Sequence, residues 1–271
     1  MKTKSFLRWA GSKQKLIPEL KKYWDPKFNR YMEPFMGSAK LFFSVDVEEA
    51  VLSDSNNELV ETFLQVQKNP YPIYKILKTL KVSIKDYYEI RAINPETLGT
   101  NQRAARFIYL NRLCFNGLFR TNTNGTFNVP YSGENKINVE EIFEILKTTS
   151  KKLQTAKIIC GDFEKIVISN IRKGDFVYLD PPYAVSNRRI FNQYGPQTFG
   201  IHDLNRLKNL LYFIEQKEAF FLLSYAYCSE AIQLFSEWDM RKKFTQRNIA
   251  GFSTDRRKAA ELLITNIRQI S

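Results

Sequence analysis

The sequence predicts an α/β fold with an open, mostly parallel β-sheet. Three observations favour this fold: short apolar runs rich in Val, Ile and Phe, helical segments with one apolar face between them, and an alternation of the two at both ends of a helix-rich middle. Apolar runs without polar alternation are typical of strands in a sheet that is covered on both faces. Strand, helix, strand repeats connect parallel neighbours, so we expect an open sheet with helices packed on it.

Six segments are predicted to form the strands of this sheet. They are residues 30–32, 50–53, 157–160, 176–179, 219–225 and 262–265. A helix is predicted over 203–217, where the leucines and an isoleucine recur on one stripe. Near the N-terminus, Ser12 is predicted to cap a helix that has Pro18 in its first turn.

The middle of the chain differs from its flanks. Consecutive helices are predicted at 57–67, 71–80, 84–93 and 101–114. A hairpin is predicted over 118–130, because Asn124-Gly125 at its centre suits the positive φ values of a tight turn. We therefore predict two domains: an α/β domain made of residues 1–55 and 155–271, and a helical insertion of residues 56–154.

Composition excludes several classes of protein. A chain of 271 residues that is 44% hydrophobic and 25% charged is ordinary globular protein, not disordered, collagenous or coiled coil. Its longest apolar stretches run about five residues, far short of the roughly 20 that a membrane-spanning helix needs. The N-terminus has no apolar core of signal-peptide length, so we expect a cytoplasmic protein without a membrane partner. Three widely spaced cysteines argue against a disulfide framework.

The charge is unusual, because the net value of +13 is concentrated in three segments. Residues 1–30 carry +7, residues 99–136 carry +4 and residues 241–271 carry +6, while the remaining residues sum to −4. Aromatic and aliphatic residues interrupt each segment, so none is a low-complexity tail. Such an excess favours a polyanionic partner, usually nucleic acid. Solvated helix faces are the alternative explanation.

The segment Asp180-Pro181-Pro182-Tyr183 directly follows the strand predicted at 176–179. Ligands of open α/β sheets bind beyond the carboxyl ends of the strands. Two consecutive prolines withhold two N–H donors, so their carbonyls are rigid, unpaired acceptors, and Asp180 adds a further acceptor. With the flat ring of Tyr183, this set suits an exocyclic amino group on a planar base. An ordinary turn is the alternative.

A second constellation lies near the N-terminus. Residues 33–38, Glu-Pro-Phe-Met-Gly-Ser, follow the first predicted strand and precede a predicted helix. Gly37 would allow a close backbone approach to a ligand at that helix N-terminus. Asp54 lies about 20 residues further on, where an acidic side chain accepts hydrogen bonds from ribose hydroxyls in doubly wound folds. A nucleoside-containing cofactor fits both features, although Asp54 could equally begin a turn.

Several ordered motifs resemble those of the N6-adenine DNA methyltransferases of the α class, the D12-type Dam family. They are Trp9-Ala10-Gly11-Ser12-Lys13, Glu33-Pro34-Phe35-Met36-Gly37-Ser38, Leu110-Asn111-Arg112, Phe115-Asn116-Gly117-Leu118, Phe127-Asn128-Val129-Pro130, Gly161-Asp162-Phe163 and Asp180-Pro181-Pro182-Tyr183. The resemblance extends to residues 261–266 and thus spans nearly the whole chain. Ordered motifs with consistent spacing are far more specific than any single one.

The resemblance implies a Rossmann-like sheet domain that binds S-adenosylmethionine, with the helical insertion as target-recognition domain. It implies thirteen cofactor-binding residues: Trp9, Ala10, Gly11, Lys13, Glu33, Pro34, Phe35, Gly37, Ser38, Asp54, Asp162, Phe163 and Asp180. Residues 33–38 would approach the methionine part, Asp54 would hold the ribose, and Asp162 with Phe163 would border the cofactor adenine. Ser12, Ser38 and Ala39 replace glycines common in the family, and we expect altered affinity rather than lost binding.

The implied reaction transfers a methyl group from S-adenosylmethionine to N6 of an adenine that is flipped out of duplex DNA. The catalytic candidates are Asp180, Pro181, Pro182 and Tyr183. The Asp180 carboxylate and the Pro181 carbonyl would accept the two N6 hydrogens while Tyr183 stacks on the base, so that catalysis rests mainly on positioning. The resemblance suggests a GATC or other GAT-containing palindrome as target.

DNA contacts are assigned to the recognition stretch. The candidates are Arg112, Phe115, Asn116, Arg120 and Asn124. Arg120 and Asn116 suit base-edge hydrogen bonds, and Phe115 is suited either to the space opened by flipping or to core packing. We expect a monomer, encoded by a bacterium or phage. A cognate restriction endonuclease with the same target site is a possible partner, and no contact with it is implied; a solitary methyltransferase is the alternative. We expect no metal site, because the only histidine is His202.

Other functions remain open at this point. Cytosine N4 and adenine in RNA present the same exocyclic amine. A glutamine side-chain methyltransferase would typically have Asn in place of Asp180 and would not need the basic excess. A DNA-binding module without catalytic activity would explain the charge but not the cofactor motifs.

Overall fold

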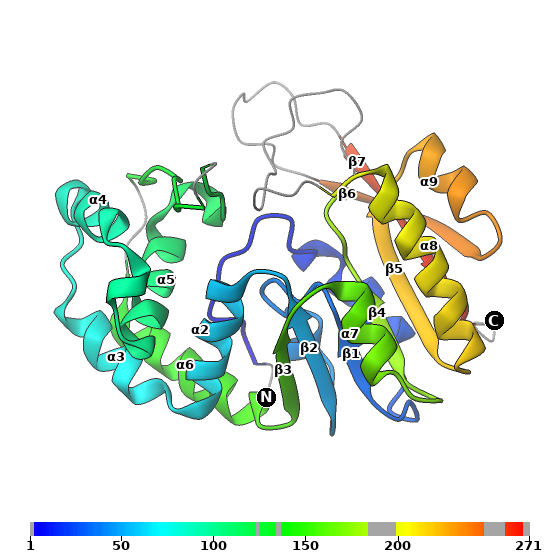
Figure 1. Ribbon diagram of the computed structural model, residues 1–271, viewed down its shortest axis with the longest axis horizontal. Coiled ribbons are helices and arrows are strands. Elements are labelled where there is room, and N and C mark those ends of the chain that lie inside the picture. Colours follow the sequence, from blue (N-terminus) through cyan, green and yellow to red (C-terminus); the bar gives the residue numbers. More distant parts are fainter. Residues whose placement is uncertain (1–2, 123–124, 134–136, 184–198, 247–257, 268–271) are drawn as a thin grey trace.

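The computed structural model describes residues 3–122, 125–133, 137–183, 199–246 and 258–267, and it contains one large β-sheet (Figure 1). Its strands are β1 (Tyr31–Glu33), β2 (Ala50–Asp54), β3 (Ala156–Cys160), β4 (Phe176–Leu179), β5 (Phe220–Ala226), β6 (Asp239–Gln246) and β7 (Lys258–Thr265). Their order is β3-β2-β1-β4-β5-β7-β6. Strands β1 to β5 pair in parallel, whereas β7 is antiparallel to both β5 and β6. The predicted open, mostly parallel sheet is confirmed.

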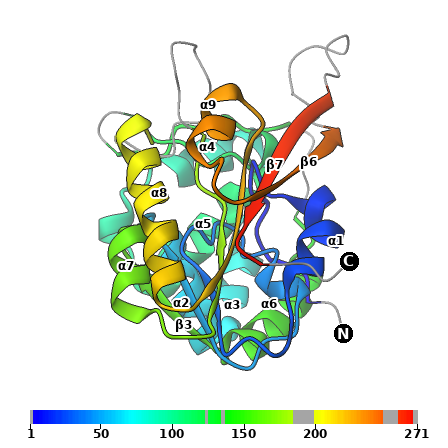
Figure 2. The same cartoon turned by 90° about the vertical axis from the view of Figure 1, so that its right-hand side faces the viewer.

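Apolar side chains cover both faces of this sheet, as the unbroken apolar runs predict. In β4, Phe176 and Tyr178 point into one buried cluster, while Val177 and Leu179 point into another. The second cluster includes residues of α7 (Phe163–Asn170) and α8 (Ile201–Gln216). Figure 2 shows the sheet between these two helices on one side and α1 (Ile17–Leu20) on the other. The strands thus form the middle of a three-layer arrangement.

The helices between β2 and β3 gather beside the sheet (Figure 1). They are α2 (Asn57–Lys68), α3 (Pro70–Thr79), α4 (Ile84–Ala92), α5 (Thr100–Leu113) and α6 (Val139–Leu153). The first four lie within a residue or two of the predicted segments. One apolar cluster continues from Tyr31 of β1 and from Phe42 to Phe63 and Leu146 of these helices. The division into domains at residues 56 and 154 therefore stays a prediction, because the core does not break there.

The sequence pattern missed β6, α6 and α9 (Ser229–Leu234). Strand β6 reads Asp-Met-Arg-Lys-Lys-Phe-Thr-Gln and lies at the edge of the sheet. An edge strand has one neighbour and much solvent contact, so charged side chains are tolerated there and no apolar run marks it. The predicted hairpin is present in part: Thr121 forms an antiparallel bridge with Phe127, and the Asn128 N–H donates to the Arg120 carbonyl at 3.0 Å. Asn124 lies outside the described residues.

Two local predictions near the N-terminus were wrong. Ser12 does not cap a helix: a 3-10 turn at Gln14–Leu16 follows it, and the Ser12 hydroxyl accepts a hydrogen bond of 2.8 Å from Lys40 Nζ. Pro18 does lie in the first turn of α1, as predicted. The loop after β1 leads only to a 3-10 turn at Phe42–Ser44, because Ala39 adopts a φ of 49°, which no α-helix allows.

The carboxyl ends of β1, β2 and β4 meet at one edge of the sheet, because these strands are parallel neighbours. Successive strands run outward from β1 through β2 to β3, and on its other side through β4 to β5, so the chain order reverses between β1 and β4. Ligands of open α/β sheets bind at such a reversal. No helix in the part of the chain described is long and apolar enough to cross a bilayer.

Candidate active site

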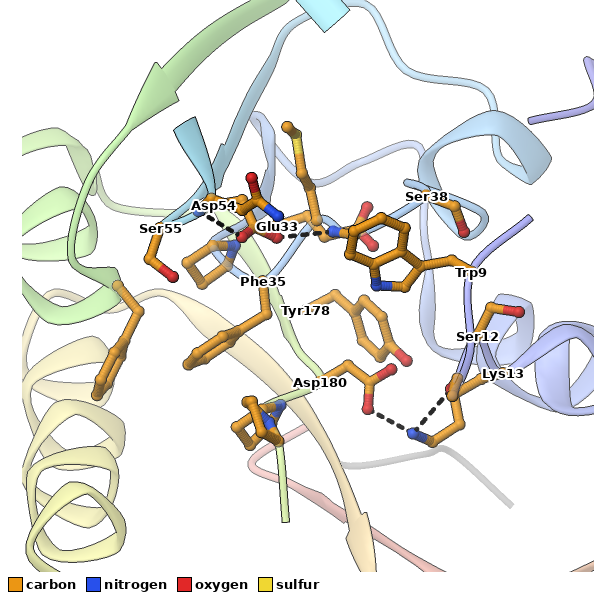
Figure 3. Close-up of a pocket in the computed structure, with 18 of the residues that line it drawn as sticks. Trp9, Ser12, Lys13, Glu33, Phe35, Ser38, Asp54, Ser55, Tyr178 and Asp180 are labelled. Atoms are coloured by element: carbon orange, nitrogen blue, oxygen red, sulfur yellow. Dashed lines mark hydrogen bonds and ion pairs between the residues drawn. The ribbon is translucent and has the colours of Figure 1, made fainter. Parts of the chain in front are cut away.

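A cavity of about 460 Å³ opens where the chain order reverses, within the range typical of small-molecule sites (Figure 3). All thirteen residues proposed for the cofactor line it, and so do all four proposed for catalysis. They come from residues 9–13, from the carboxyl end of β1 and the segment after it, from the carboxyl end of β2, and from the segments after β3 and β4. The fold therefore brings together motifs that lie far apart in the sequence.

Asp180 lies at the floor of this pocket and pairs with Lys13 (Figure 3). Lys13 Nζ is 2.6 Å from Asp180 Oδ1, and the Ser224 hydroxyl donates to the same oxygen at 3.0 Å. Oδ2 accepts no hydrogen bond from any residue that the structure describes. Burial alone would lower the pKa of Lys13, but the charge of Asp180 raises it above its usual range. Burial raises the pKa of Asp180, and Lys13 opposes that rise.

The hydroxyl of Tyr183 fixes the position of its ring. It donates to both carboxylate oxygens of Glu261 at 2.8 Å, and Glu261 is buried. The Lys13 ammonium lies 5.2 Å from the ring centroid, and Tyr225 contacts the ring edge-on. A ring that is tethered at one end and contacted at its edge is held in one orientation, ready to present a face to a planar ligand.

Gly37 and Asp54 build the wall opposite Asp180. Asp54 Oδ2 accepts the Gly37 backbone N–H and Oδ1 accepts that of Asn56, both at 3.0 Å. Gly37 has a φ of 45°, and a Cβ added there would lie 2.9 Å from Trp9 Cδ1 and Nε1. The predicted close approach at Gly37 is therefore made by the Trp9 indole, which Figure 3 shows beside this loop. Each Asp54 oxygen keeps a second lone pair for a ligand hydroxyl.

The far end of the pocket is aromatic and charged. Asp162 caps α7, its Oδ1 accepting the Lys165 backbone N–H at 3.2 Å. The Phe163 ring stacks on Phe35 with 4.9 Å between centroids. Asp162 is close to Asp54 in the fold, because the Gly161 N–H donates to the Asp54 backbone carbonyl at 3.0 Å. A flat ring bonded to a ribose at Asp54 would meet these groups next.

Comparison with known proteins identifies the family. Residues 9–249 match the family model of the D12 class N6 adenine-specific DNA methyltransferases. The chain belongs to this family. The resemblance seen in the ordered motifs is thereby confirmed, and the chain is an adenine-specific DNA methyltransferase.

Three relatives of this methyltransferase match over nearly their full length. The Type II methyltransferase M1.LlaDCHI of Lactococcus lactis subsp. cremoris is 32% identical over 270 residues, covering 96% of this chain and 94% of the relative. The Type II methyltransferase M.MjaIII of Methanocaldococcus jannaschii is 31% identical, covering 98% and 100%. A DNA adenine methylase of Haemophilus influenzae is 30% identical, covering 97% and 93%.

Four of the residues proposed to contact DNA in this methyltransferase, Arg112, Phe115, Asn116 and Arg120, are described by the structure and do not line the pocket. Phe115 is 41% exposed, so it is not a core residue, and Asn116 next to it has a φ of 55°. Arg112 is only half-exposed, and its Nε is buried without a hydrogen bond. Arg120 Nε donates to Asn128 Oδ1 at 2.8 Å. The Ala10 N–H donates to the Gly117 carbonyl at 3.2 Å, which joins the pocket motif to this recognition stretch.

Sequence reasoning gave no role to Ser224, Glu261 and Arg206, which contact the proposed site residues. A signal exists for Glu261, because it interrupts the apolar run Ala259-Ala260-Glu261-Leu262-Leu263. A carboxylate in a buried strand needs a hydrogen-bonding partner, and here the partner is Tyr183. Ser224 and Arg206 carry no such mark, because serine and arginine are common in strands and helices.

Glu33 of this methyltransferase is buried and titrates abnormally. Burial raises its pKa well above the ordinary 4.5, and the Asp180 and Asp54 carboxylates add to the rise, whereas the Tyr31 hydroxyl, which donates at 2.9 Å, lowers it. At pH values between the unfolded and the folded pKa, the native state therefore keeps a proton on Glu33 that the unfolded chain has lost. Its contribution to stability is complete below the unfolded pKa and is lost as the pH rises towards the folded-state pKa.

Glu33→Gln is expected to flatten this pH dependence. The amide does not titrate, so between about pH 5 and pH 8 the free energy of unfolding should fall less in the variant than in the natural protein. Urea unfolding at a series of pH values measures this difference. Glu144→Gln, at a side chain that is 68% exposed, is the matched control and should follow the natural protein. Parallel pH profiles for Glu33→Gln and the natural protein would contradict the assignment.

Proposed function

We propose that this enzyme uses S-adenosylmethionine to methylate N6 of an adenine flipped out of duplex DNA, in GATC or another GAT-containing palindrome. The observation that carries the proposal is that the nucleoside-binding candidates Asp54 and Asp162 line the same pocket as Asp180 and Tyr183. When bound, S-adenosylmethionine supplies an electrophilic methyl group on a sulfonium sulfur. The residues present suit it, because lone pairs on Asp54 remain for ribose hydroxyls and aromatic rings remain for a purine.

Asp180 is the proposed acceptor for the target amine. Lys13 and Ser224 both occupy its Oδ1 and so fix the carboxylate plane, while Oδ2 remains for one N6 hydrogen. The Pro181 carbonyl takes the other hydrogen, because no backbone N–H of the residues that the structure describes donates to it. Two acceptors draw the N6 lone pair out of conjugation with the ring and orient it. The negative charge of Asp180 also stabilises the positive charge that develops on N6.

Tyr183 and Lys13 support this arrangement in different ways. Tyr183, tethered to Glu261, holds the flipped base by stacking and recovers part of the energy spent on extrusion. Lys13 keeps its charge beside Asp180 and so makes the ionised carboxylate tolerable in a buried position. Both act by positioning rather than by covalent chemistry.

The helical insertion 56–154 is the proposed target-recognition domain. Arg112, Phe115, Asn116 and Arg120 lie on α5 or in the loop that follows it, and Asn124 is retained as a candidate from the sequence. Phe115 and Asn116 are exposed, as base contacts require. The related proteins include Type II methyltransferases as well as DNA adenine methylases, so a restriction endonuclease with the same target remains part of the proposal.

The experiment that tests this proposal follows the label from methyl-labelled S-adenosylmethionine into nucleic acid. The protein is incubated with plasmid DNA, with duplexes that contain GATC or a GGTC substitute, and with RNA of the same sequence, and the products are digested to nucleosides. We expect label in N6-methyladenine from the GATC duplex and none from the substitute. Label in N4-methylcytosine, label only in RNA, or no transfer would each overturn the proposal.

A further inference from the structure

A single arginine joins three carboxylates at the purine end of the pocket. Arg206 of α8 donates from Nη2 to Asp162 Oδ1 at 2.6 Å, from Nε to Glu164 Oε2 at 2.7 Å and from Nη1 to Asp203 Oδ1 at 3.0 Å. Asp162 and Glu164 begin α7, and Asp203 lies in the first turn of α8. The two helices lie side by side (Figures 1 and 2). Without Arg206, three like charges would face one another across the helix ends.

Arg206 holds the Asp162 carboxylate in one orientation. Oδ1 accepts from both Arg206 and the Lys165 backbone N–H, whereas no side chain that the structure describes donates to Oδ2. Partial burial raises the pKa of Asp162, but the hydrogen bonds from Arg206 and the Lys165 backbone N–H, together with the charge of Arg206, lower it by more, so the pKa is lowered overall. The carboxylate therefore stays ionised, and an ionised carboxylate can only accept hydrogen bonds. Its free oxygen suits an N–H donor and repels a carbonyl oxygen.

Arg206 also supports the aromatic wall beside this oxygen. Its guanidinium lies 4.7 Å from the centroid of the Phe163 ring, which stacks on Phe35. Phe199 contacts Phe35 edge-on at 6.2 Å. Asp162, Phe163, Phe199 and Arg206 all line the pocket. A planar base lying on this wall would place its edge near Asp162.

We propose that Arg206 is a positioning residue that makes the pocket select a 6-aminopurine over a 6-oxopurine. By fixing Asp162, it presents Oδ2 to the 6-amino group of the cofactor base, which a 6-oxo group cannot satisfy. The inference rests on the proposed use of S-adenosylmethionine and goes beyond it, because it assigns the choice of base to a residue of α8.

The test is isothermal titration calorimetry of the full chain with two ligands, S-adenosylhomocysteine and its 6-oxo counterpart S-inosylhomocysteine. We expect the natural protein to bind the 6-amino ligand about 10- to 100-fold more tightly, as the loss of one hydrogen bond to a charged group implies. In Arg206→Met this preference should shrink to about threefold or less, because Asp162 is no longer held. Arg206→Lys, which keeps one charge but not the forked geometry, should give an intermediate preference.

Arg103→Met is the matched control. Arg103 is also a paired arginine, joined to Glu61 through Nε at 2.7 Å and 26% exposed, but it belongs to α5 and does not line the pocket. The Arg103→Met variant should prefer the 6-amino ligand by the same factor as the natural protein. If Arg206 had a purely structural role, Arg206→Met would weaken the binding of both ligands equally and would leave the preference between them unchanged.

The outcomes separate the inference from the function on which it rests. If the natural protein binds neither ligand, the proposed cofactor is wrong. If it binds both equally, or if Arg206→Met keeps the preference, the inference is wrong and the cofactor stands. Should circular dichroism show that Arg206→Met does not fold, an unchanged preference in Arg206→Lys overturns the inference instead.

Discussion

Replacing Asp180 with alanine is expected to lower the rate of methyl transfer by about 10²- to 10³-fold or more, while DNA binding persists. The change removes the oxygen proposed to accept an N6 hydrogen and the charge that stabilises the methylated amine. It also leaves the Lys13 ammonium, only 9% exposed, without its carboxylate. Single-turnover transfer of labelled methyl groups measures the rate, and gel-shift titration with a target duplex measures DNA affinity.

Two further variants separate the chemistry at Asp180 from its structural contacts. Asp180→Asn keeps the shape but removes the charge, and its rate should fall nearly as far as that of the alanine variant. Ser224→Ala keeps the Asp180 carboxylate and removes its 3.0 Å hydrogen bond to Oδ1, together with the 3.1 Å hydrogen bond between Ser224 and the Tyr178 hydroxyl. The rate should fall by no more than about tenfold. Transfer at nearly the natural rate in Asp180→Asn would remove Asp180 from its proposed role.

Replacing Arg30 with methionine is expected to lower the free energy of unfolding by about 3–5 kcal/mol. Arg30 donates to Asp175 from Nε at 3.1 Å and from Nη2 at 2.7 Å. The two side chains are 6% and 0% exposed, so the variant leaves a carboxylate buried without a cation. The pair lies just before β1 and β4, which carry Glu33 and Asp180 at their opposite ends. The loss of stability is read from urea unfolding.

The double variant Arg30→Met, Asp175→Leu is the control for this prediction. Because the double variant has neither charge, it leaves no buried carboxylate without a cation, and much of the lost stability should return. Lys22→Met breaks the exposed pair with Glu19, in which Lys22 is 61% exposed, and should change stability little. A loss below about 1 kcal/mol in Arg30→Met would mean that water reaches Asp175 and that the pair is not energetically buried.

The sequence predicted the sheet well because its signals are local. The run Phe176-Val177-Tyr178-Leu179 is recognisable without its neighbours, and a parallel arrangement follows from the strand, helix, strand alternation. Glu33, Asp54 and Asp180 were found for a related reason: they lie at or directly after the carboxyl ends of strands, and the carboxyl ends of parallel strands share one edge. Trp9 and Lys13 precede β1, so only the family resemblance indicated them. The edge strand β6, with its charged side chains, was missed because solvent contact removes the apolar signal.

Local signals failed where distant segments compete for a residue. Ser12 has the chemistry of a helix cap, yet the ammonium of Lys40, 28 residues away, binds its hydroxyl. Gly37 suggested space for a ligand, yet the Trp9 indole fills the gap above it. In both cases a contact made on folding replaced the role that the local pattern indicated.

The sequence by itself determined every strand of the described sheet except β6, and it placed Asp54, Asp162, Asp180 and Tyr183 among the ordered motifs that resemble those of a methyltransferase family. Only the tertiary structure decided how these groups are held. Glu261 anchors Tyr183 across 78 residues, and Arg206 and Ser224 fix Asp162 and Asp180, each across 44. The physical reason is that a strand forms from the preferences of its own residues. Which carboxylate oxygen stays available depends instead on the hydrogen-bond donors that lie within about 3 Å, and the packing of remote helices and strands decides which donors those are.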